Sequence, residues 1–366
     1  MLSIVEESAM SYTKVYQPDI YCPSCYFRSG PISGKKKVLL QITEKCNLHC
    51  KHCFVSATGK GNDIDYSMFV STILPHLIEG SINKVTITGG EPLVYSKVAN
   101  VVEMLTKNGI SVGICSNATL VNVDLCEALS SLGNVHFNVS LDGFSELSHG
   151  HFRGSADSGI FDRTISGIKL LSDYKLLQGV LVTPNKYASL DEYVEICRFA
   201  KSLRAKYVLF NPLSEFGRGE DSVGLAYTSE LMCELKDRTA VFADASFEVV
   251  YIRFPNTEQL PLSGCVAGDI TYIFSNGDVA ICPYMAFSSK DRVSKYHYEN
   301  FIIGNIFDTS FNYNDAIDHY SLPINSGYIC AACKNSKCLK GCYAAKISKG
   351  LSLADADKEL CPLANK

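Results

Sequence analysis

Six short apolar runs, rich in β-branched residues, alternate with segments of helical periodicity over the first two thirds of this chain. The runs are VLLQIT from Val38, KVTIT from Lys84, ISVGIC from Ile110, NVHFNVS from Asn134, GVLVT from Gly179 and AKYVLF from Ala205. Helical spacing lies between most of them, at 66–77, 98–107, 123–132 and 190–203. Such runs predict strands, and strands connected through helices pair in parallel. The alternation predicts an α/β fold, a partial (β/α)6 barrel of the TIM type.

Polar residues and glycines follow nearly every predicted strand. They occupy 43–46, 89–92, 116–117, 140–143, 183–185 and 211–212. In α/β barrels, the residues that carry function lie at the carboxyl ends of the parallel strands. We therefore expect a functional site at this end of the barrel.

The pattern changes after about residue 225. One more helix (229–242) and a short strand (247–252) lead to TYIF-SNGD-VAIC, which alternates around an Asn276-Gly277 turn and predicts a β-hairpin. The chain then divides into an N-terminal extension with a C-x2-C pair over 1–36, a barrel over 37–225, a bridging helix and strand over 226–260, and a cysteine-rich domain over 261–366.

The chain has 16 cysteines, and their meaning depends on the compartment. No apolar stretch approaches the ~20 residues that span a bilayer, and the first residues do not resemble a signal peptide. We therefore expect a cytoplasmic protein with no membrane partner, in which cysteines bind metal or carry redox chemistry. The net charge of −4 gives no basic field, so no nucleic-acid partner is expected either.

Cys46, Cys50 and Cys53 follow the first predicted strand with the spacing C-x3-C-x2-C. Three thiolates on one loop can hold three irons of a [4Fe-4S] cubane and leave the fourth iron open to an exogenous ligand. Zinc is the alternative, because His49, His52 or a remote residue could complete its four nitrogen and sulfur ligands. The loop by itself does not decide between iron and zinc.

This loop resembles the signature of the radical S-adenosylmethionine (SAM) superfamily, and other strand ends resemble that family's other motifs. Gly89-Gly90-Glu91-Pro92 is similar to the GGEP motif, which engages the methionine ammonium of SAM. Ser140 and Asp142 resemble the S-x-D element beside the SAM ribose and carboxylate, and Arg153 resembles an arginine that pairs with that carboxylate. Taken alone, these last three could equally be a turn-capping pair and a surface arginine. The residues expected around SAM, including the pair at the third strand end, are Gly89, Gly90, Glu91, Pro92, Ser116, Asn117, Ser140, Asp142 and Arg153.

Seven further cysteines resemble the SPASM domain, which adds up to two auxiliary [4Fe-4S] clusters to radical SAM barrels. They read C-x11-G-x4-C and then C-x2-C-x4-C-x3-C, whose middle gap is one residue shorter than the commonest pattern. A structural zinc ribbon would explain only four of the seven. The resemblance implies a distal cluster on Cys330, Cys333, Cys338 and Cys361, and a proximal cluster on Cys265, Cys282 and Cys342.

The proximal set is one ligand short. Anaerobic sulfatase maturases supply a further cysteine six residues after the first, but this chain has Thr271 there. The cluster could keep an open iron that binds substrate. Alternatively, it could borrow a ligand such as Asp269 or the N-terminal pair Cys22 and Cys25. The sequence leaves these possibilities open.

The resemblance implies an enzyme, a radical SAM oxidoreductase that cleaves SAM reductively to methionine and a 5′-deoxyadenosyl radical, which abstracts hydrogen from a substrate. SPASM proteins act mostly on ribosomally made peptides, so the leading hypothesis is a peptide maturase that forms thioether or carbon–carbon cross-links, or epimerises residues. An electron donor of the flavodoxin or ferredoxin type is implied. Only 45 residues precede Cys46, so a leader peptide would need a separate binding protein or the barrel mouth.

Three other functions were weighed against peptide maturation. A radical enzyme acting on a small molecule such as a tetrapyrrole would share every motif above. Sulfatase maturation is disfavoured, because Pro283 follows Cys282 where those enzymes place a catalytic aspartate. A non-catalytic iron–sulfur or zinc scaffold would keep the cysteines but would not need Glu91 or Ser140.

Overall fold

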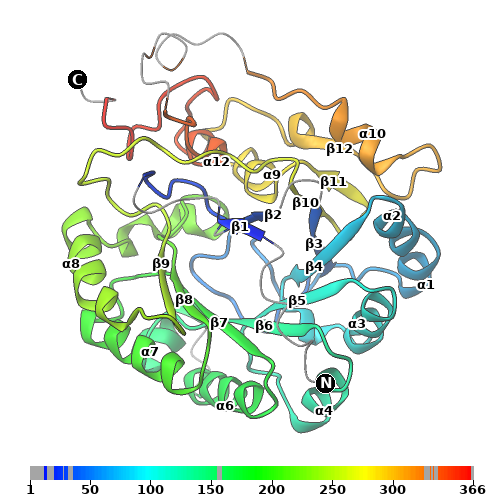
Figure 1. Cartoon of the computed structure of the whole chain (residues 1–366), viewed down its shortest axis with the longest axis horizontal. Coiled ribbons are helices and arrows are strands. Elements are labelled where there is room, and N and C mark those ends of the chain that lie inside the picture. Colours follow the sequence, from blue (N-terminus) through cyan, green and yellow to red (C-terminus); the bar gives the residue numbers. More distant parts are fainter. Residues whose placement is uncertain are drawn as a thin grey trace, which may run out of the picture.

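The structure, a computed structural model, describes residues 12–14, 20–27, 29–31, 36–154, 159–324, 330, 333 and 337–363. A ten-stranded sheet of order β12-β11-β10-β3-β4-β5-β6-β7-β8-β9 curves around the middle of the molecule, with helices on its outer side (Figure 1). The strands from β3 to β9 all pair in parallel. They are β3 (Lys36–Thr43), β4 (Ile82–Gly89), β5 (Ser111–Ser116), β6 (Val135–Ser140), β7 (Leu177–Val182), β8 (Tyr207–Phe210) and β9 (Glu248–Tyr251).

Side chains along each strand point alternately to the outer and inner faces of the sheet. In β4, Val85 and Ile87 are fully buried in the core that the outer helices cover, whereas Lys84 and Thr86 lie on the opposite, inner face. The helices are α1 (Tyr66–Met68) and α2 (Leu74–Glu79), joined by the π-helical η1 (Phe69–Ile73), then α3 (Val98–Lys107), α4 (Val123–Ser130), α6 (Ile160–Asp173), α7 (Leu190–Ser202) and α8 (Ser229–Thr239). None of the helices in the described ranges is long and apolar enough to cross a bilayer.

The predicted α/β barrel is confirmed, and six of its strands, β3 to β8, are the six apolar runs. The short strand expected in the bridging segment is β9, which pairs in parallel with β8 and extends the barrel sheet. Val250 and its neighbour Ile252 pack against Tyr207 and Leu209 on the inner face. This shared apolar contact explains why the segment joins the sheet.

The cysteine-rich part continues the same sheet. The predicted hairpin is β10 (Ile270–Ile273) and β11 (Asp278–Ala280), with Gly277 at φ 89° in the turn. Strand β10 pairs in parallel with β3, and β12 (Ile302–Asn305) follows β11. The remaining elements are β1 (Tyr12–Lys14), β2 (Ser29–Pro31), α5 (His151–Arg153), α9 (Pro283–Ser288), α10 (Tyr313–Asp318) and α12 (Tyr343–Ile347). Most of the N-terminal extension expected over 1–36 lies outside the described residues.

A buried ion pair ties the end of β9 to both terminal segments. The Arg253 side chain is 2% exposed, and its Nη1 lies 2.7 Å from Oδ2 of the equally buried Asp357. The same nitrogen donates to the Ser24 carbonyl at 3.0 Å, and Nη2 lies 2.7 Å from Glu359 Oε2. Arg253 therefore holds the N-terminal segment and the C-terminal cysteine-rich segment against the barrel.

Replacing Arg253 with methionine should lower the free energy of unfolding by about 3–5 kcal/mol, because Asp357 would keep a buried charge without its partner. Anaerobic urea denaturation followed by circular dichroism measures this loss. The double change Arg253→Met/Asp357→Leu should recover much of it. The control is Arg292→Met, whose side chain is 78% exposed. Equal unfolding midpoints for Arg253→Met and the unchanged protein would contradict the interpretation.

Candidate active site

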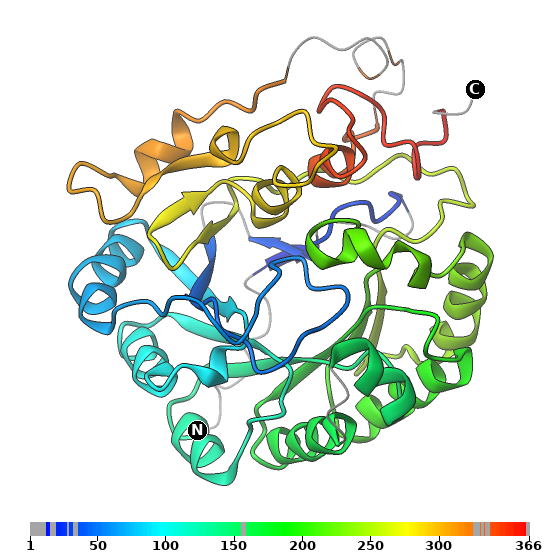
Figure 2. The same cartoon turned by 180° about the vertical axis from the view of Figure 1, so that it is seen from behind.

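The residues expected around SAM converge at the carboxyl ends of neighbouring strands. The cysteine loop follows β3, residues 89–92 follow β4, Ser116 and Asn117 lie at the end of β5, and Ser140 ends β6. Because these strands are parallel and adjacent, their carboxyl ends share one edge of the sheet. In Figure 2 the blue loop after β3 crosses the middle of the barrel on this side.

The three cysteines of the loop lie together at one small apolar cluster. Leu48, Cys50 and Ile160 are buried together, and Cys46 and Cys53 pack against them. Burial raises the pKa of Cys50 to about 12 and that of Cys46 to about 11, so iron must displace protons from these thiols as it binds. Three thiols on one loop are the donor set of a cubane with one open iron.

No three Cys, His, Asp or Glu side chains within the described ranges lie close enough together to hold a single metal ion. A cubane does not require such closeness, because its cysteine ligands are spread over different irons. The loop residues therefore fit a [4Fe-4S] cluster, the first of the two alternatives that its spacing leaves open.

The two glycines of the 89–92 turn let it lie directly against the start of the cysteine loop. Gly90 N–H donates to the Thr43 carbonyl and Glu91 N–H donates to the Lys45 carbonyl, each at 2.9 Å. A Cβ at Gly90 would lie 2.1 Å from the Lys45 oxygen, and one at Gly89 would lie 2.1 Å from the Thr43 oxygen. Only glycine permits this approach, so the turn also positions the loop that begins at Cys46.

Glu91 is held with its carboxylate inside the site. It is 1% exposed and accepts from Ser116 Oγ and Asn117 N–H, both at 2.7 Å, and from Leu93 N–H at 3.1 Å. Burial raises the pKa of Glu91, although these hydrogen bonds oppose the rise. A carboxylate has about four acceptor positions. Glu91 can therefore accept one more donor, such as an ammonium group.

Asp142 and Arg153 form a buried pair beside the cysteine loop. Arg153 Nε lies 2.5 Å from Asp142 Oδ2, while Thr183 N–H donates to Oδ1 at 2.7 Å. Burial alone would raise the pKa of Asp142, but the Arg153 guanidinium and nearby His52 outweigh burial and lower it. Arg153 Nη1 is 4.0 Å from Cys50 Sγ. Arg153 thus joins the β6 end to the loop, and the predicted pairing with the SAM carboxylate stays a prediction.

His52 is a neutral side chain within the same loop. Its ring stacks on Phe152 with centroids 4.4 Å apart, and burial lowers its pKa to about 4. His52 Nδ1 is buried and has no hydrogen-bond partner in the part of the chain that the structure describes. The imidazole therefore offers one polar atom to whatever occupies the site.

Sequence reasoning missed Arg218, which clamps the cysteine loop from outside. It lies in the 3-10 helical η4 (Gly217–Leu225). Its Nε donates to the Cys50 carbonyl at 2.8 Å, its Nη1 to the Ala57 carbonyl at 2.7 Å, and its N–H to the Cys53 carbonyl at 3.0 Å. At Gly217 a Cβ would lie 2.6 Å from the Cys53 oxygen. The sequence signal was slight: a G-R-G triplet a few residues beyond a strand end.

The structure groups the seven cysteines of the C-terminal cysteine-rich part in two places. Cys330 interacts electrostatically with Cys361, Cys338 and Cys333, and its thiol lies 3.6 Å from the Asp355 carbonyl. Elsewhere, Cys282 interacts with Cys265 and Cys342, and these last two interact with each other. The two groups correspond to the distal and proximal sets that the sequence pattern implies.

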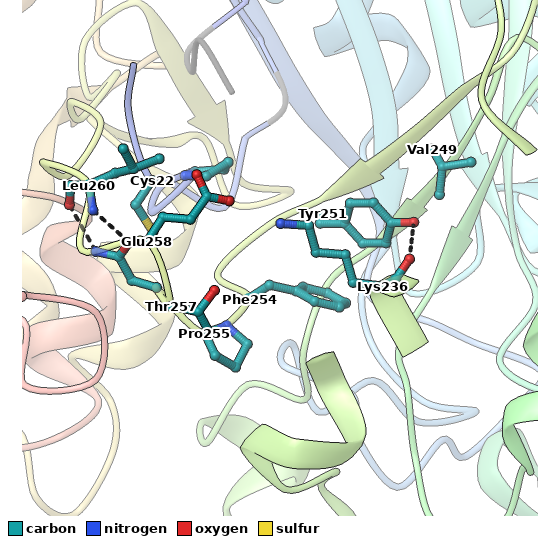
Figure 3. Close-up of a pocket in the computed structure, with 11 residues that line it drawn as sticks. Cys22, Lys236, Val249, Tyr251, Phe254, Pro255, Thr257, Glu258 and Leu260 are labelled. Carbon is teal, nitrogen blue, oxygen red and sulfur yellow. Dashed lines mark hydrogen bonds between the residues drawn. The ribbon is translucent and has the colours of Figure 1, made fainter. Parts of the chain in front are cut away.

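A pocket of about 250 Å³ opens between α8, β9 and the segment that follows β9. Figure 3 shows Tyr251 and Lys236 on one side of it and Cys22 and Leu260 on the other. The residues expected around SAM do not line it. Cys22 thus borders a pocket apart from the cysteine loop, and both Cys22 and Cys25 are buried.

Gly90→Ala should lower SAM cleavage about a hundredfold, because a misplacement of about 1 Å near the reacting groups can have that effect. The added methyl group must push the Lys45 carbonyl, and with it Cys46. The assay is dithionite-dependent 5′-deoxyadenosine formation by anaerobically reconstituted protein. Gly59→Ala is the matched control, because a Cβ there meets nothing within 4 Å. Equal rates for the two variants would show that the close contact does not matter.

Arg218→Ala should speed the loss of iron from the cysteine loop to a chelator by about tenfold or more. Each charge-assisted hydrogen bond that the variant loses contributes about 1.5–3 kcal/mol. The readout is the electron paramagnetic resonance (EPR) signal of the cluster on the cysteine loop, which is identified by its change when SAM is added. The decay of this signal after chelator is added gives the rate of iron loss. Arg292→Ala is the control, because the pairs of Arg292 in the described part of the chain are with Glu220 and Asp221 of η4 and not with the cysteine loop. A decay rate equal to that of the control would refute the clamp.

Residues 40–201 match the Radical SAM superfamily. The mycofactocin maturase MftC of Mycolicibacterium smegmatis is 27% identical over 338 residues, which cover 87% of this chain and 81% of that protein. The AdoMet-dependent heme synthase of Methanosarcina barkeri is 31% identical over 196 residues, which cover 52% of this chain and 54% of that protein. Streptococcus suis SuiB bound to its precursor peptide SuiA shares the fold, with a TM-score of 0.69 at 20% identity over 91% of this chain and 77% of SuiB.

The matched residues contain the cysteine loop, the glycine turn, Glu91 and the Asp142–Arg153 pair. The matches to the mycofactocin maturase and to SuiB extend beyond these residues. Residues 40–201 are therefore a radical SAM domain, and the chain is an enzyme whose cofactors are SAM and [4Fe-4S] clusters.

Proposed function

We propose that this enzyme matures a ribosomally synthesised peptide, by removing a hydrogen atom so that a cross-link or an inverted centre can form. The extent of the match to the mycofactocin maturase carries this proposal. That match covers 87% of this chain, which is more than the barrel and so includes cysteine-rich residues. The match to the heme synthase covers 52% of the chain. The match to the maturase, unlike the match to the heme synthase, therefore reaches the cysteine-rich region that follows the barrel.

The chain's own residues would bind and orient SAM. When bound, the cluster and SAM supply the one-electron chemistry that removes hydrogen from the substrate. In this proposal Glu91 takes the methionine ammonium at its remaining acceptor position. Arg153 takes the SAM carboxylate with its terminal nitrogens, because Nε is already paired with Asp142. Gly89, Gly90 and Arg218 would hold the cysteine loop, and with it a bound cluster, in place beside Glu91 and Arg153.

Two partners belong to the same proposal. A cytoplasmic flavodoxin or ferredoxin would supply the electron, and a separate protein would present the leader segment of the peptide. The complex of SuiB with SuiA shows that a protein of this fold holds a precursor peptide. A tetrapyrrole is the second candidate substrate, which the 31% identity to the heme synthase favours.

The test offers both substrate classes to the reconstituted enzyme with SAM and dithionite, and mass spectrometry follows each. The peptide arm uses a short Cys-, Ser- or aromatic-rich peptide encoded beside the gene. We expect it to lose a pair of hydrogen atoms, or to take up deuterium from D₂O if a centre is inverted. Cys50→Ala should abolish both changes. An unchanged peptide, together with consumption of iron coproporphyrin, would overturn the proposal in favour of the tetrapyrrole.

A further inference from the structure

The N-terminal C-P-S-C sequence, residues 22–25, docks on the chain just before Cys265. Cys22 N–H donates to the Pro261 carbonyl at 2.8 Å, and Ser263 N–H donates to the Cys22 carbonyl at 3.0 Å. Ser24 N–H then donates to Ser263 Oγ at 3.0 Å, and both serine side chains are fully buried. These bonds fix the register of the two segments. Cys25, the next residue after Ser24, therefore lies beside the residues that precede Cys265.

The segment that leads to Cys342 is fixed to the same short piece of backbone. Leu339 N–H donates to the Leu262 carbonyl and Gly341 N–H donates to the Ser263 carbonyl, each at 3.0 Å. Residues 262–263 are therefore hydrogen-bonded to two other segments at once. Cys25 follows Ser24 directly, Cys342 follows Gly341 directly, and Cys265 lies two residues after Ser263.

The thiols at the ends of these segments meet. The Cys25 thiol donates a hydrogen bond to the Cys342 sulfur, and Cys265 lies near both. Cys282 interacts with both Cys265 and Cys342. Cys25, Cys282 and Cys342 are each at most 5% exposed. The proximal set of three cysteines thus has a fourth cysteine beside it, within the buried interior.

The other candidates for the missing ligand are engaged elsewhere. Asp269 interacts with Lys36, and its carbonyl accepts from Lys37 N–H. The Thr271 hydroxyl is hydrogen-bonded to the Tyr313 hydroxyl. Cys22 packs with Leu262 and Leu360, against Cys338 and Cys361 of the distal set. Of these candidates, all of which the structure describes, Cys25 is the one that lies beside the proximal set.

We propose that Cys25 is the fourth cysteine ligand of the proximal auxiliary cluster, so that no iron of this cluster is open to substrate. On binding, the Cys25 thiol loses its proton to solvent and its sulfur takes the remaining iron position. The cluster is then a carrier of electrons and does not bind substrate through iron. This proposal rests on the auxiliary cluster and not on the identity of the substrate.

The test removes the cysteine-loop cluster with Cys46→Ala/Cys50→Ala/Cys53→Ala, so that every signal belongs to the auxiliary clusters. In this background Cys25→Ala is compared with Cys22→Ala, a buried cysteine of the same tetrapeptide. After anaerobic reconstitution and mild oxidation, Cys25→Ala should show the EPR signal of a [3Fe-4S]⁺ cluster, because an iron without a protein ligand is lost. The Cys22→Ala protein should not. The signal in both variants, or in neither, would overturn the assignment.

A second measurement does not depend on whether the Cys25 variant folds. The background protein with Cys25 intact is reduced and exposed to ¹³C-cyanide, and electron–nuclear double resonance detects carbon bound to iron. With four cysteine ligands on each auxiliary cluster, no coupling is expected. A strong ¹³C coupling would reveal an open iron and contradict the proposal. Neither measurement contains a substrate, so its outcome is separate from that of the peptide test.

Discussion

The backbone of residues 43–45 is the constraint on which the active site depends. Its carbonyl oxygens at Thr43 and Lys45 accept from Gly90 and Glu91, so the end of β3 and the turn after β4 are locked together. The contact leaves no room for a Cβ, which is why two glycines stand there. It also places Glu91 under Ser116 and Asn117 and starts the cysteine loop at Cys46. A single backbone contact therefore fixes both the cluster and the acceptor for SAM relative to each other.

The charges gathered beside that contact are more than fold stability requires. Glu91, Asp142 and Arg153 are at most 8% exposed. Buried ion pairs are often no more stabilising than apolar side chains of similar volume. Perturbed charged groups in one place are instead typical of functional sites. Here the positive end of the group, Arg153, stands 4.0 Å from Cys50 Sγ, where the negative charge of thiolates bound to iron would be partly offset.

Local patterns predicted the parts of the molecule that depend on nearby residues. The six strands, the Asn276-Gly277 hairpin and the carboxyl-end location of the site follow from alternation and turn chemistry. Helix α6 was not predicted, because Gly167 interrupts its apolar pattern, and the structure shows that glycine packed against the Ala118 carbonyl. Arg218 was missed, and the choice between Cys22, Cys25 and Asp269 was left open, for another reason. Arg218 contacts Cys50 from 168 residues away, and the Ser24–Ser263 contact beside Cys25 spans 239 residues.

The packing between the two cysteine groups bears on whether the proximal cluster could touch a substrate. Phe54 follows Cys53, Tyr26 follows Cys25, and both rings contact Tyr284, with centroids 5.5 Å and 4.8 Å away. Tyr284, two residues after Cys282, is partly buried among these rings, and desolvation raises the pKa of its hydroxyl. These rings fill the space that joins the cysteine loop to the proximal set. A substrate beside SAM would have to displace them to reach an iron there.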